Sequence, residues 1–139
     1  MKFTSLFIVM TFFLLTACGA AEQSAPELIL EEETLQLPLE IDVHTTAVVQ
    51  NREDVILIDV REQWEYDEAH IPNITLIPMS EIANRLDEIP KDKEVILTCR
   101  SGNRSGQVTN LLQQNGFDNV HNMQGGILAW QQAGYAVER

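Results

Sequence analysis

Two short apolar runs with charged residues at their ends constrain the fold of this chain more than any other feature. The runs are DVILIDV, residues 54–60, and EVILT, residues 94–98. Both are rich in β-branched residues and lack strict apolar-polar alternation, as expected of strands buried on both faces of a parallel sheet. Such a sheet needs helices on both sides, which is the arrangement of an α/β domain.

Helical patterns lie between and after these strands. Residues 80–86 carry apolar side chains at helical spacing, and Ser80 is placed to cap the first turn. Residues 104–115 place three apolar side chains on one helix face: Val108, Leu111 and Leu112. Gly116 follows as a natural C-terminal stop. Both segments are therefore predicted to be helices.

The C-terminal part continues the same alternation. We expect a short strand near Val120 and a last helix over residues 126–133. Together with the earlier segments, this predicts one α/β domain with a mostly parallel sheet over residues 41–139. A domain of this length can bury a single core.

Residues 1–17 have the pattern of a bacterial lipoprotein signal peptide. Lys2 precedes a stretch without charge, Phe3 to Leu15, that is shorter than the roughly 20 residues of a membrane-spanning helix. The sequence LTAC at residues 15–18 resembles the lipobox, in which the cysteine is diacylated and becomes the mature N-terminus. An ordinary signal peptide, cleaved nearby with Cys18 incidental, is the alternative.

Acylation of Cys18 would anchor the protein outside a bacterial cell membrane without spanning it. Residues 19–40 contain six glutamates and no basic residue, so residues 18–40 are predicted to be a lipidated cysteine with an acidic, flexible tether. The full chain has 9 basic and 21 acidic side chains, for a net charge of −12. This balance argues against nucleic acid as a partner and against a polybasic membrane contact.

The segment CRSGNR, residues 99–104, joins the strand over residues 94–98 to the next helix. In open α/β sheets, ligands bind at such loops, outside the carboxyl ends of the strands. The loop aims backbone N–H groups inward and adds the positive end of the next helix dipole. Gly102 permits the curvature that this requires. The segment therefore has the chemistry of an anion-binding loop that begins with a cysteine.

Cys99 has four conceivable roles, and the sequence separates them. A disulfide needs a partner, and the only other cysteine is Cys18, outside the domain. A metal site needs further ligands, and the three histidines show no ligand spacing to Cys99. A packing cysteine is not normally surrounded by Arg, Ser, Gly and Asn. A reactive thiolate fits, since helix N-termini and cations lower a cysteine pKa from about 8.5 to roughly 3.5–7.5.

Three segments together carry a family resemblance: LIDVREQWEYDEAHIPN, EVILTCRSGNRS and GFDNVHNMQGGILAW. In order and spacing they resemble the signatures of a single-domain rhodanese, over about residues 41–139. The resemblance implies a rhodanese-like α/β fold, with a five-stranded parallel sheet and helices on both faces.

The resemblance also implies sulfur transfer. Cys99 would attack the outer sulfur of a small anionic donor such as thiosulfate, hold it as a persulfide and pass it to a thiol or cyanide. The residues expected to bind substrate and persulfide follow in the loop: Arg100, Ser101, Gly102, Asn103, Arg104 and Ser105. Their backbone N–H groups would stabilise the persulfide, and the two arginines would attract the donor. No cofactor or metal is required.

Two other functions remain open. A persulfide carrier or sulfur-sensing module that serves a partner protein would share the same loop. A phosphatase or arsenate reductase of the same fold would place five residues between cysteine and arginine, whereas four separate Cys99 from Arg104. A count of five would lead to Ser105, which cannot bind an oxyanion bidentately. The loop length therefore favours sulfur chemistry.

The remaining family positions are interpreted mostly as scaffold. Asp59, Arg61 and Glu65 resemble the family's charged set after the second strand, and we expect structural pairing. Trp64 and Trp130 are expected to be core or lid-packing aromatics.

Three further residues are expected to shape turns. His70 lies in the sequence AHIPN, where the family's histidine more often ties a turn than moves protons. Gly125 and Gly126 are expected to open the last helix by a close backbone approach, near the Cys99 loop.

Overall fold

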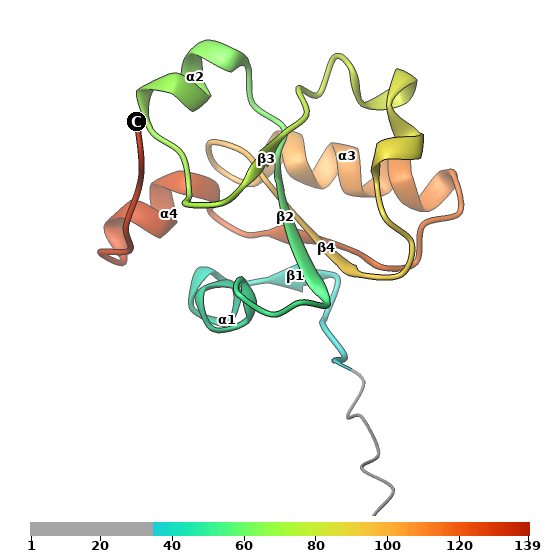
Figure 1. Cartoon of the computed structure of the whole chain (residues 1–139), viewed down its shortest axis with the longest axis horizontal. Coiled ribbons are helices and arrows are strands. Elements are labelled where there is room, and N and C mark those ends of the chain that lie inside the picture. The colour runs from blue at the N-terminus through green and yellow to red at the C-terminus, as the bar shows by residue number, and fades with distance from the viewer. Residues whose placement is uncertain (1–34) are drawn as a thin grey trace, which may run out of the picture. The chain divides into compact units, whose positions relative to one another are not determined.

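Five parallel strands form one sheet at the centre of the domain (Figure 1). The computed structural model describes residues 35–139. The strand order is β1-β5-β4-β2-β3, and every pairing is parallel, so the prediction of a five-stranded parallel sheet is confirmed. The strands are β1 (Glu40–Ile41), β2 (Val55–Asp59), β3 (Thr75–Leu76), β4 (Glu94–Thr98) and β5 (Val120–Met123).

The described part also contains four α-helices and two short 3₁₀ helices, all between strands except the last, which follows β5. They are α1 (Val43–Val49), α2 (Gln63–Glu68), η1 (Ile82–Asn84), η2 (Leu86–Glu88), α3 (Asn103–Gln114) and α4 (Gly126–Gln132). Within residues 35–139, none of these helices has the length and apolarity needed to cross a membrane.

The core consists of two clusters of buried side chains on opposite faces of the sheet. In β4, Val95 and Leu97 belong to one cluster and Ile96 to the other, as the alternation of a strand requires. Val108 and Leu112 of α3 pack into the first cluster, together with residues of η1 and η2. Helices α1 and α4 pack into the second cluster. The sheet is therefore covered on both faces, which explains why β2 and β4 are almost entirely apolar.

The helix predicted over residues 80–86 is wrong, because the chain forms the 3₁₀ helices η1 and η2 there instead. The backbone N–H groups of Ile77 and Met79 bond to carbonyls at the end of β2, which keeps the chain extended up to that point. Pro90 then holds the preceding residue in an extended conformation. The chain between these two restraints forms only two short 3₁₀ turns, and Ser80 caps neither of them.

The other predicted elements are close to the observed ones. The helix predicted over residues 104–115 is α3, and Gly116 ends it in the left-handed region with φ 82°. The strand near Val120 is β5, and the last helix is α4, one residue shorter than predicted.

Helices α1 and α2 were not predicted individually. Helix α1 consists of VHTTAVV, which is rich in β-branched residues and has no strong helical pattern. Asp42 compensates by capping the first turn, where its carboxylate accepts hydrogen bonds from the N–H groups of His44 and Thr45. Helix α2 begins with a capping box between Glu62 and Glu65.

The predictions for residues 1–34, which include the signal peptide, Cys18 and most of the tether, lie outside the described residues. The described end of the predicted tether belongs to the folded domain. Leu35 and Leu37 pack against the second core cluster, and Glu40 pairs with β5 as part of β1. The domain therefore begins before Ile41, where the sequence had suggested its boundary.

Candidate active site

Cys99 lies directly after β4, at the carboxyl edge of the sheet, in the strand-to-helix loop that the sequence predicted. Its side chain is almost completely buried, with 1% of the residue exposed. The N–H of Gly102 donates a hydrogen bond to the Cys99 Sγ over 3.1 Å, and the Ser105 hydroxyl oxygen lies 3.4 Å from the same sulfur. The loop therefore folds around the sulfur and points hydrogen-bond donors at it.

These donors decide the ionisation of the thiol. Burial alone would raise the pKa of Cys99, because it disfavours the charged thiolate. The hydroxyl of Ser105 and the backbone N–H groups of Ser105, Ser101 and Gly102 act in the opposite direction. Their combined effect is the stronger one and holds the pKa of Cys99 below its ordinary value. The site thus favours an anionic sulfur without exposing it to water.

Gly102 is the residue that lets the loop turn so tightly. Its φ is 90°, in the left-handed region, and it is the N-cap of α3. A Cβ at this position would lie 3.1 Å from the backbone nitrogen of Gly125 and 3.2 Å from the carbonyl oxygen of Met123. The loop therefore needs a glycine here both for its backbone angle and for its contact with the next turn.

The start of α4 holds the Cys99 loop from the other side. The N–H of Ile127 donates to the carbonyl of Cys99 over 2.9 Å, and the N–H of Leu128 donates to that of Arg100 over 3.1 Å. Gly126, with φ 57°, makes the contact possible, since a Cβ there would collide with the Cys99 carbonyl oxygen. The predicted close backbone approach of this glycine turn to the Cys99 loop is confirmed.

Arg104 is held by a carboxylate that the sequence had not indicated as its partner. Its guanidinium binds the Glu65 carboxylate with two hydrogen bonds, Nη1 to Oε2 over 2.7 Å and Nη2 to Oε1 over 2.6 Å. The Arg104 hydrogen bonds are the main reason that the pKa of Glu65 lies below its usual value. The expected attraction of an anionic donor by Arg104 stays a prediction.

Asp59 and Arg61 form a second, buried ion pair beneath the site. The Arg61 Nη2 lies 2.7 Å from Asp59 Oδ2 and also donates to the carbonyl of Ala69 over 2.7 Å. This bonding ties the end of β2 to the end of α2. The structural pairing expected for these residues is what the structure contains, although Arg61 also contributes to the wall of the pocket described next.

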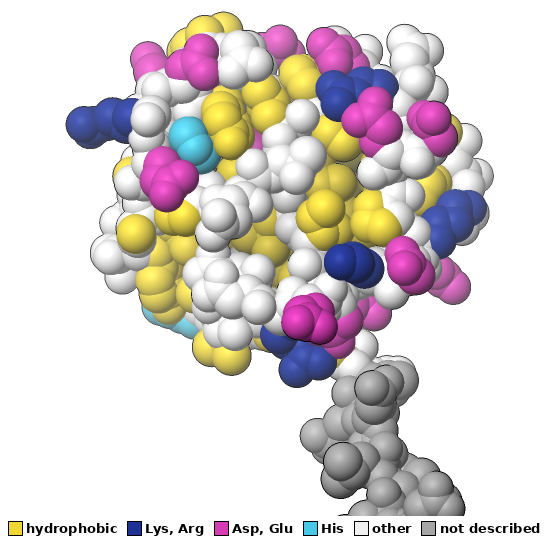
Figure 2. Space-filling model, viewed as in Figure 1, with side chains coloured by type: hydrophobic (Ala, Val, Ile, Leu, Met, Phe, Trp, Pro, Cys, Tyr) yellow, Lys and Arg dark blue, Asp and Glu magenta, His cyan; other side chains and the backbone are white. Residues whose placement is uncertain are grey.

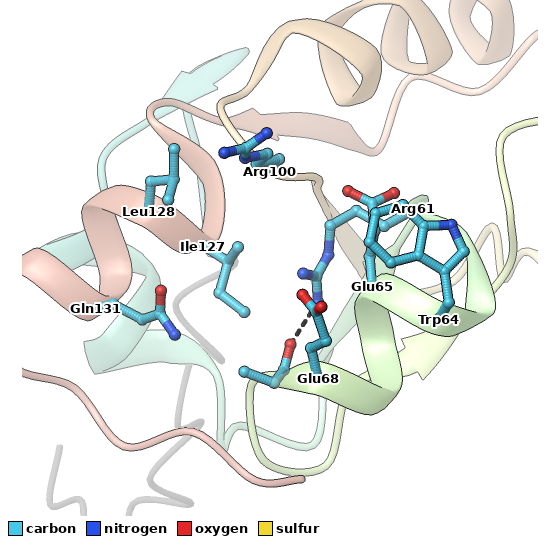
Figure 3. Close-up of a pocket in the computed structure, with 9 residues that line it drawn as sticks. Arg61, Trp64, Glu65, Glu68, Arg100, Ile127, Leu128 and Gln131 are labelled. Carbon is cyan, nitrogen blue, oxygen red and sulfur yellow. Dashed lines mark hydrogen bonds between the residues drawn. The ribbon is translucent and has the colours of Figure 1, made fainter.

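A pocket of about 320 Å³ opens beside the Cys99 loop, between α2 and α4 (Figure 3). Arg100, the residue after Cys99, and Ile127, which binds the Cys99 carbonyl, both line it. The remaining lining residues come mainly from the two helices: Arg61, Trp64, Glu65, Glu68, Ala69, Leu128 and Gln131. The pocket therefore lies against the Cys99 loop and against the start of α4, which holds that loop. Arg100 brings a positive charge to the pocket.

The two tryptophans have different roles. Trp130 is buried in the second core cluster, as expected, and its indole N–H donates to the carbonyl of Ala136. Trp64 lines the pocket and is 64% exposed, so it is not a core residue, and the lid-packing role that was the other expectation stays a prediction. Its position on α2, a helix of only six residues at the edge of the sheet, leaves little protein to cover it.

The other predicted residues have local roles in the described structure. Ser101 offers its backbone N–H to the sulfur, and Asn103 begins α3, with its side-chain oxygen accepting a hydrogen bond from Gln107. His70 bonds through Nδ1 to the Tyr66 carbonyl oxygen over 3.0 Å and stacks on the Tyr66 ring. The expectation that this histidine ties a turn is confirmed.

The family model described as a Rhodanese-like domain matches residues 45–133. The chain belongs to the rhodanese-like family. A sulfurtransferase of Allochromatium vinosum is 44% identical to this rhodanese domain over 85 residues, which cover 61% of this chain and 79% of that protein. A thiosulfate sulfurtransferase of Pseudoalteromonas translucida is 31% identical over 93 residues, or 67% and 89% of the two chains.

Solved structures agree with this assignment. The crystal structure of a rhodanese-related protein from Thermoplasma volcanium superposes on the rhodanese domain with a TM-score of 0.66 and 30% sequence identity. The match covers 71% of this chain and 96% of that one. The rhodanese fold implied by the three sequence segments is thereby confirmed, and the homologues named above are sulfurtransferases.

Several pocket residues of the rhodanese domain were missed from sequence. Glu68 and Leu128 lie within the segments that carry the family resemblance, but they and Gln131 were given no role, since only the packing of α2 opposite α4 brings them to one pocket. One signal was available, because Leu128 and Gln131 share a helix face that begins at the predicted glycine turn. Asn122 of β5 was also missed, although its amide lies in the buried network around Cys99.

Proposed function

We propose that this rhodanese domain is a sulfurtransferase in which Cys99 is the nucleophile. The observation that carries the proposal is the buried Cys99 sulfur, surrounded by the N–H of Gly102, the Ser105 hydroxyl and further backbone donors. Such donors favour a thiolate on Cys99, and donors of the same loop would also stabilise the outer sulfur of a persulfide, which carries its negative charge. The homologues named as sulfurtransferases support the same chemistry.

The reaction takes place in two steps. The Cys99 thiolate attacks the sulfane sulfur of a donor such as thiosulfate, a new S–S bond forms, and the S–S bond of the donor breaks. The electron pair leaves with sulfite, and the enzyme carries a Cys99 persulfide. An acceptor nucleophile, cyanide or a thiolate, then attacks the outer sulfur. The second S–S bond breaks, and the Cys99 thiolate is regenerated.

The pocket supplies the binding part of this proposal. Arg100, the residue after Cys99 in the chain, lines the pocket, and no carboxylate within residues 35–139 forms an ion pair with it. Its guanidinium can bind the anionic end of a donor whose sulfane sulfur is directed to Cys99.

The direct test is intact-mass spectrometry of the protein after exposure to thiosulfate. We expect a mass increase of one sulfur atom, located on Cys99, and release of thiocyanate when cyanide is added. The Cys99→Ser variant should show neither. A wild-type protein that stays unmodified while its thiol remains reduced would contradict the proposal.

A persulfide carrier that serves a partner protein is the second candidate. It is favoured by two large apolar side chains left exposed at the pocket, Trp64 at 64% and Leu128 at 47%. Such residues commonly mark contact surfaces. Slow turnover with cyanide and small thiols, combined with fast sulfur transfer to one protein, would favour the carrier over the enzyme.

Phosphatase or arsenate reductase activity fits the site less well. Only four residues separate Cys99 from Arg104, and Glu65 binds Arg104 bidentately, so two of its N–H groups are not offered to an oxyanion. We expect aryl phosphates and arsenate to remain unprocessed under conditions in which thiosulfate reacts.

We also propose that the domain works outside the cytoplasm, anchored to a bacterial membrane by acylated Cys18. The support is the secretion signal and the LTAC segment of the sequence. Wild-type protein should sediment with membranes and carry acyl chains on Cys18, and Cys18→Ser should lose both properties. Recovery of unmodified wild-type protein in the soluble fraction would contradict this location.

A further inference from the structure

The Ser105 hydroxyl has two acceptors but only one proton to donate. Its oxygen lies 2.6 Å from Asn122 Oδ1 and 3.4 Å from Cys99 Sγ. Ser105, Asn122 and Cys99 are all buried, so water does not replace the hydroxyl as a donor to Asn122 Oδ1 or to Cys99 Sγ. Both atoms are within reach of the hydroxyl, and the shorter distance favours donation to Asn122, which leaves the hydroxyl oxygen facing the sulfur.

The orientation of the Asn122 amide is fixed by Glu40. The Asn122 Nδ2 donates to Glu40 Oε2 over 2.9 Å, and an ionised carboxylate can only accept hydrogen bonds. The amide oxygen must therefore face Ser105. Glu40 itself is exposed, while the amide that it orients lies inside the domain.

These residues come from elements that only the fold brings together. Glu40 of β1 and Asn122 of β5 are direct partners in the parallel ladder. Gly106 in α3 leaves the space for the amide, because a Cβ at that position would lie 3.2 Å from Asn122 Nδ2. A glycine inside a helix is otherwise unfavourable, so this one is explained by the amide beside it.

We propose that Asn122 is a positioning residue that competes with Cys99 for the proton of the Ser105 hydroxyl. While Cys99 is a thiol, the hydroxyl donates to Asn122 and its oxygen can accept from the S–H. When the sulfur becomes a thiolate, the hydroxyl rotates to donate to it and leaves the Asn122 oxygen without that donor. Asn122 thereby limits how strongly Ser105 stabilises the charged sulfur. The extension to the persulfide rests on the proposed function.

Other charges near the network remain in place in the test. Arg104 of α3 acts on Cys99 through space and keeps its partner Glu65 of α2, while Arg100 follows Cys99 in the loop. Asp59, which is paired with Arg61, acts on Arg104 through space. None of these groups is changed in the experiment, and the one charged residue that is changed, Glu40, has its own control.

The experiment measures the rate at which iodoacetamide alkylates Cys99 in the full chain as a function of pH, with the modified peptide located by mass spectrometry. The thiolate is the reactive form, so the midpoint of the profile reports the Cys99 pKa, and the plateau at high pH reports access. Ser105→Ala removes the donor, and we expect about tenfold slower alkylation below the midpoint, with the midpoint at higher pH.

Asn122→Leu should have the opposite effect. It removes the competing acceptor, so the Ser105 hydroxyl donates to the sulfur alone and the midpoint moves to lower pH. The double variant, Ser105→Ala with Asn122→Leu, should behave like Ser105→Ala, because no hydroxyl is left to redirect. If the substitutions only loosened the site, the midpoints of both single variants would shift in the same direction, or only the plateau rates would change.

Glu40 provides a test at an exposed residue that does not touch Cys99. Glu40→Ala frees the Asn122 amide to turn its nitrogen toward Ser105, so the midpoint should move in the same direction as in Asn122→Leu. Glu40→Gln removes the charge but keeps an acceptor, and we expect a midpoint like that of the wild type. If Glu40→Gln and Glu40→Ala shift equally, charge alone is responsible and the competition is excluded.

The proposal is overturned if Asn122→Leu leaves the midpoint unchanged or moves it to higher pH. If Asn122→Leu does not fold, the same result with Glu40→Ala, a midpoint that is unchanged or moves to higher pH, overturns the proposal. Alkylation needs no sulfur donor, so a protein that forms no persulfide yet shows these shifts would overturn the proposed function and keep this inference.

Discussion

The two arginines of the Cys99 loop have different environments, although they are four residues apart. Arg104 is bound bidentately by the carboxylate of Glu65, which lies 39 residues earlier in the chain. Arg100 lines the pocket and has no ion-pair partner among residues 35–139 (Figure 3). One arginine therefore supports the loop, and the other is available to a ligand.

We expect Arg100→Gln to raise the KM for thiosulfate about fivefold with little change in kcat, because it removes one favourable charge interaction of binding. Steady-state kinetics of thiocyanate formation measure both constants. Arg52→Gln, at an exposed ion pair with Asp54, is the matched control and should leave KM unchanged. A fall in kcat alone would show that Arg100 acts in the chemical step instead.

We expect Glu65→Gln to lower the free energy of unfolding by about 1–2 kcal/mol at pH 7, between the values for exposed and buried ion pairs. The folded-state pKa of Glu65 is lowered, so its contribution is present above the unfolded value of 4.5 and is lost as the pH falls through the folded-state pKa.

Urea unfolding of wild type and Glu65→Gln at several pH values checks this dependence. The difference between the two proteins should shrink below pH 4.5. A difference that persists unchanged in acid would mean that the ion pair is not its source.

At the scale of elements, the contact between α4 and the Cys99 loop holds the site together. Two N–H groups of the first turn of α4 bind the carbonyls of Cys99 and Arg100, so the loop is fixed to a helix rather than left free. The glycine turn at residues 125–126 lets the two backbones meet at this distance.

Gly126→Ala should therefore lower the free energy of unfolding more than the same change at another glycine with a positive φ. Gly134 has φ 81° and open space around it, so Gly134→Ala should cost only the left-handed backbone strain, about 1–2 kcal/mol. Gly126→Ala adds a collision with the Cys99 carbonyl, and we expect about 1–3 kcal/mol more. Urea unfolding measures the loss of stability in each variant. Equal losses for Gly126→Ala and Gly134→Ala would contradict the expected collision with the Cys99 carbonyl.

At the scale of the whole molecule, the chain carries a net charge of −12. On the face shown in Figure 2, the few basic side chains lie among acidic ones rather than in one patch. An anionic donor must therefore approach against the overall negative field of the protein.

We expect kcat/KM for thiosulfate to rise when the salt concentration increases from about 20 mM to about 300 mM, since salt screens the long-range repulsion. Alkylation of Cys99 by neutral iodoacetamide should not change over this range. A fall in kcat/KM with salt would instead show that attraction by Arg100 outweighs the net charge.

The pattern of the sequence by itself determined the sheet and the position of the Cys99 loop. Runs of apolar β-branched residues place β2 and β4 without reference to distant contacts, and positions such as Gly102 and Gly116 follow from local backbone angles. Helix α1 was missed because its stability comes from one cap and from burial, not from its own periodicity.

Tertiary structure decided which side chains meet. The partner of Arg104 is on α2, the competitor for the Ser105 proton is on β5, and the residue that orients it is on β1. Exposure of Trp64 likewise depends on how little protein surrounds α2. Local sequence patterns do not predict these contacts, because charge pairing and buried hydrogen bonds depend on distances that arise only when the elements pack.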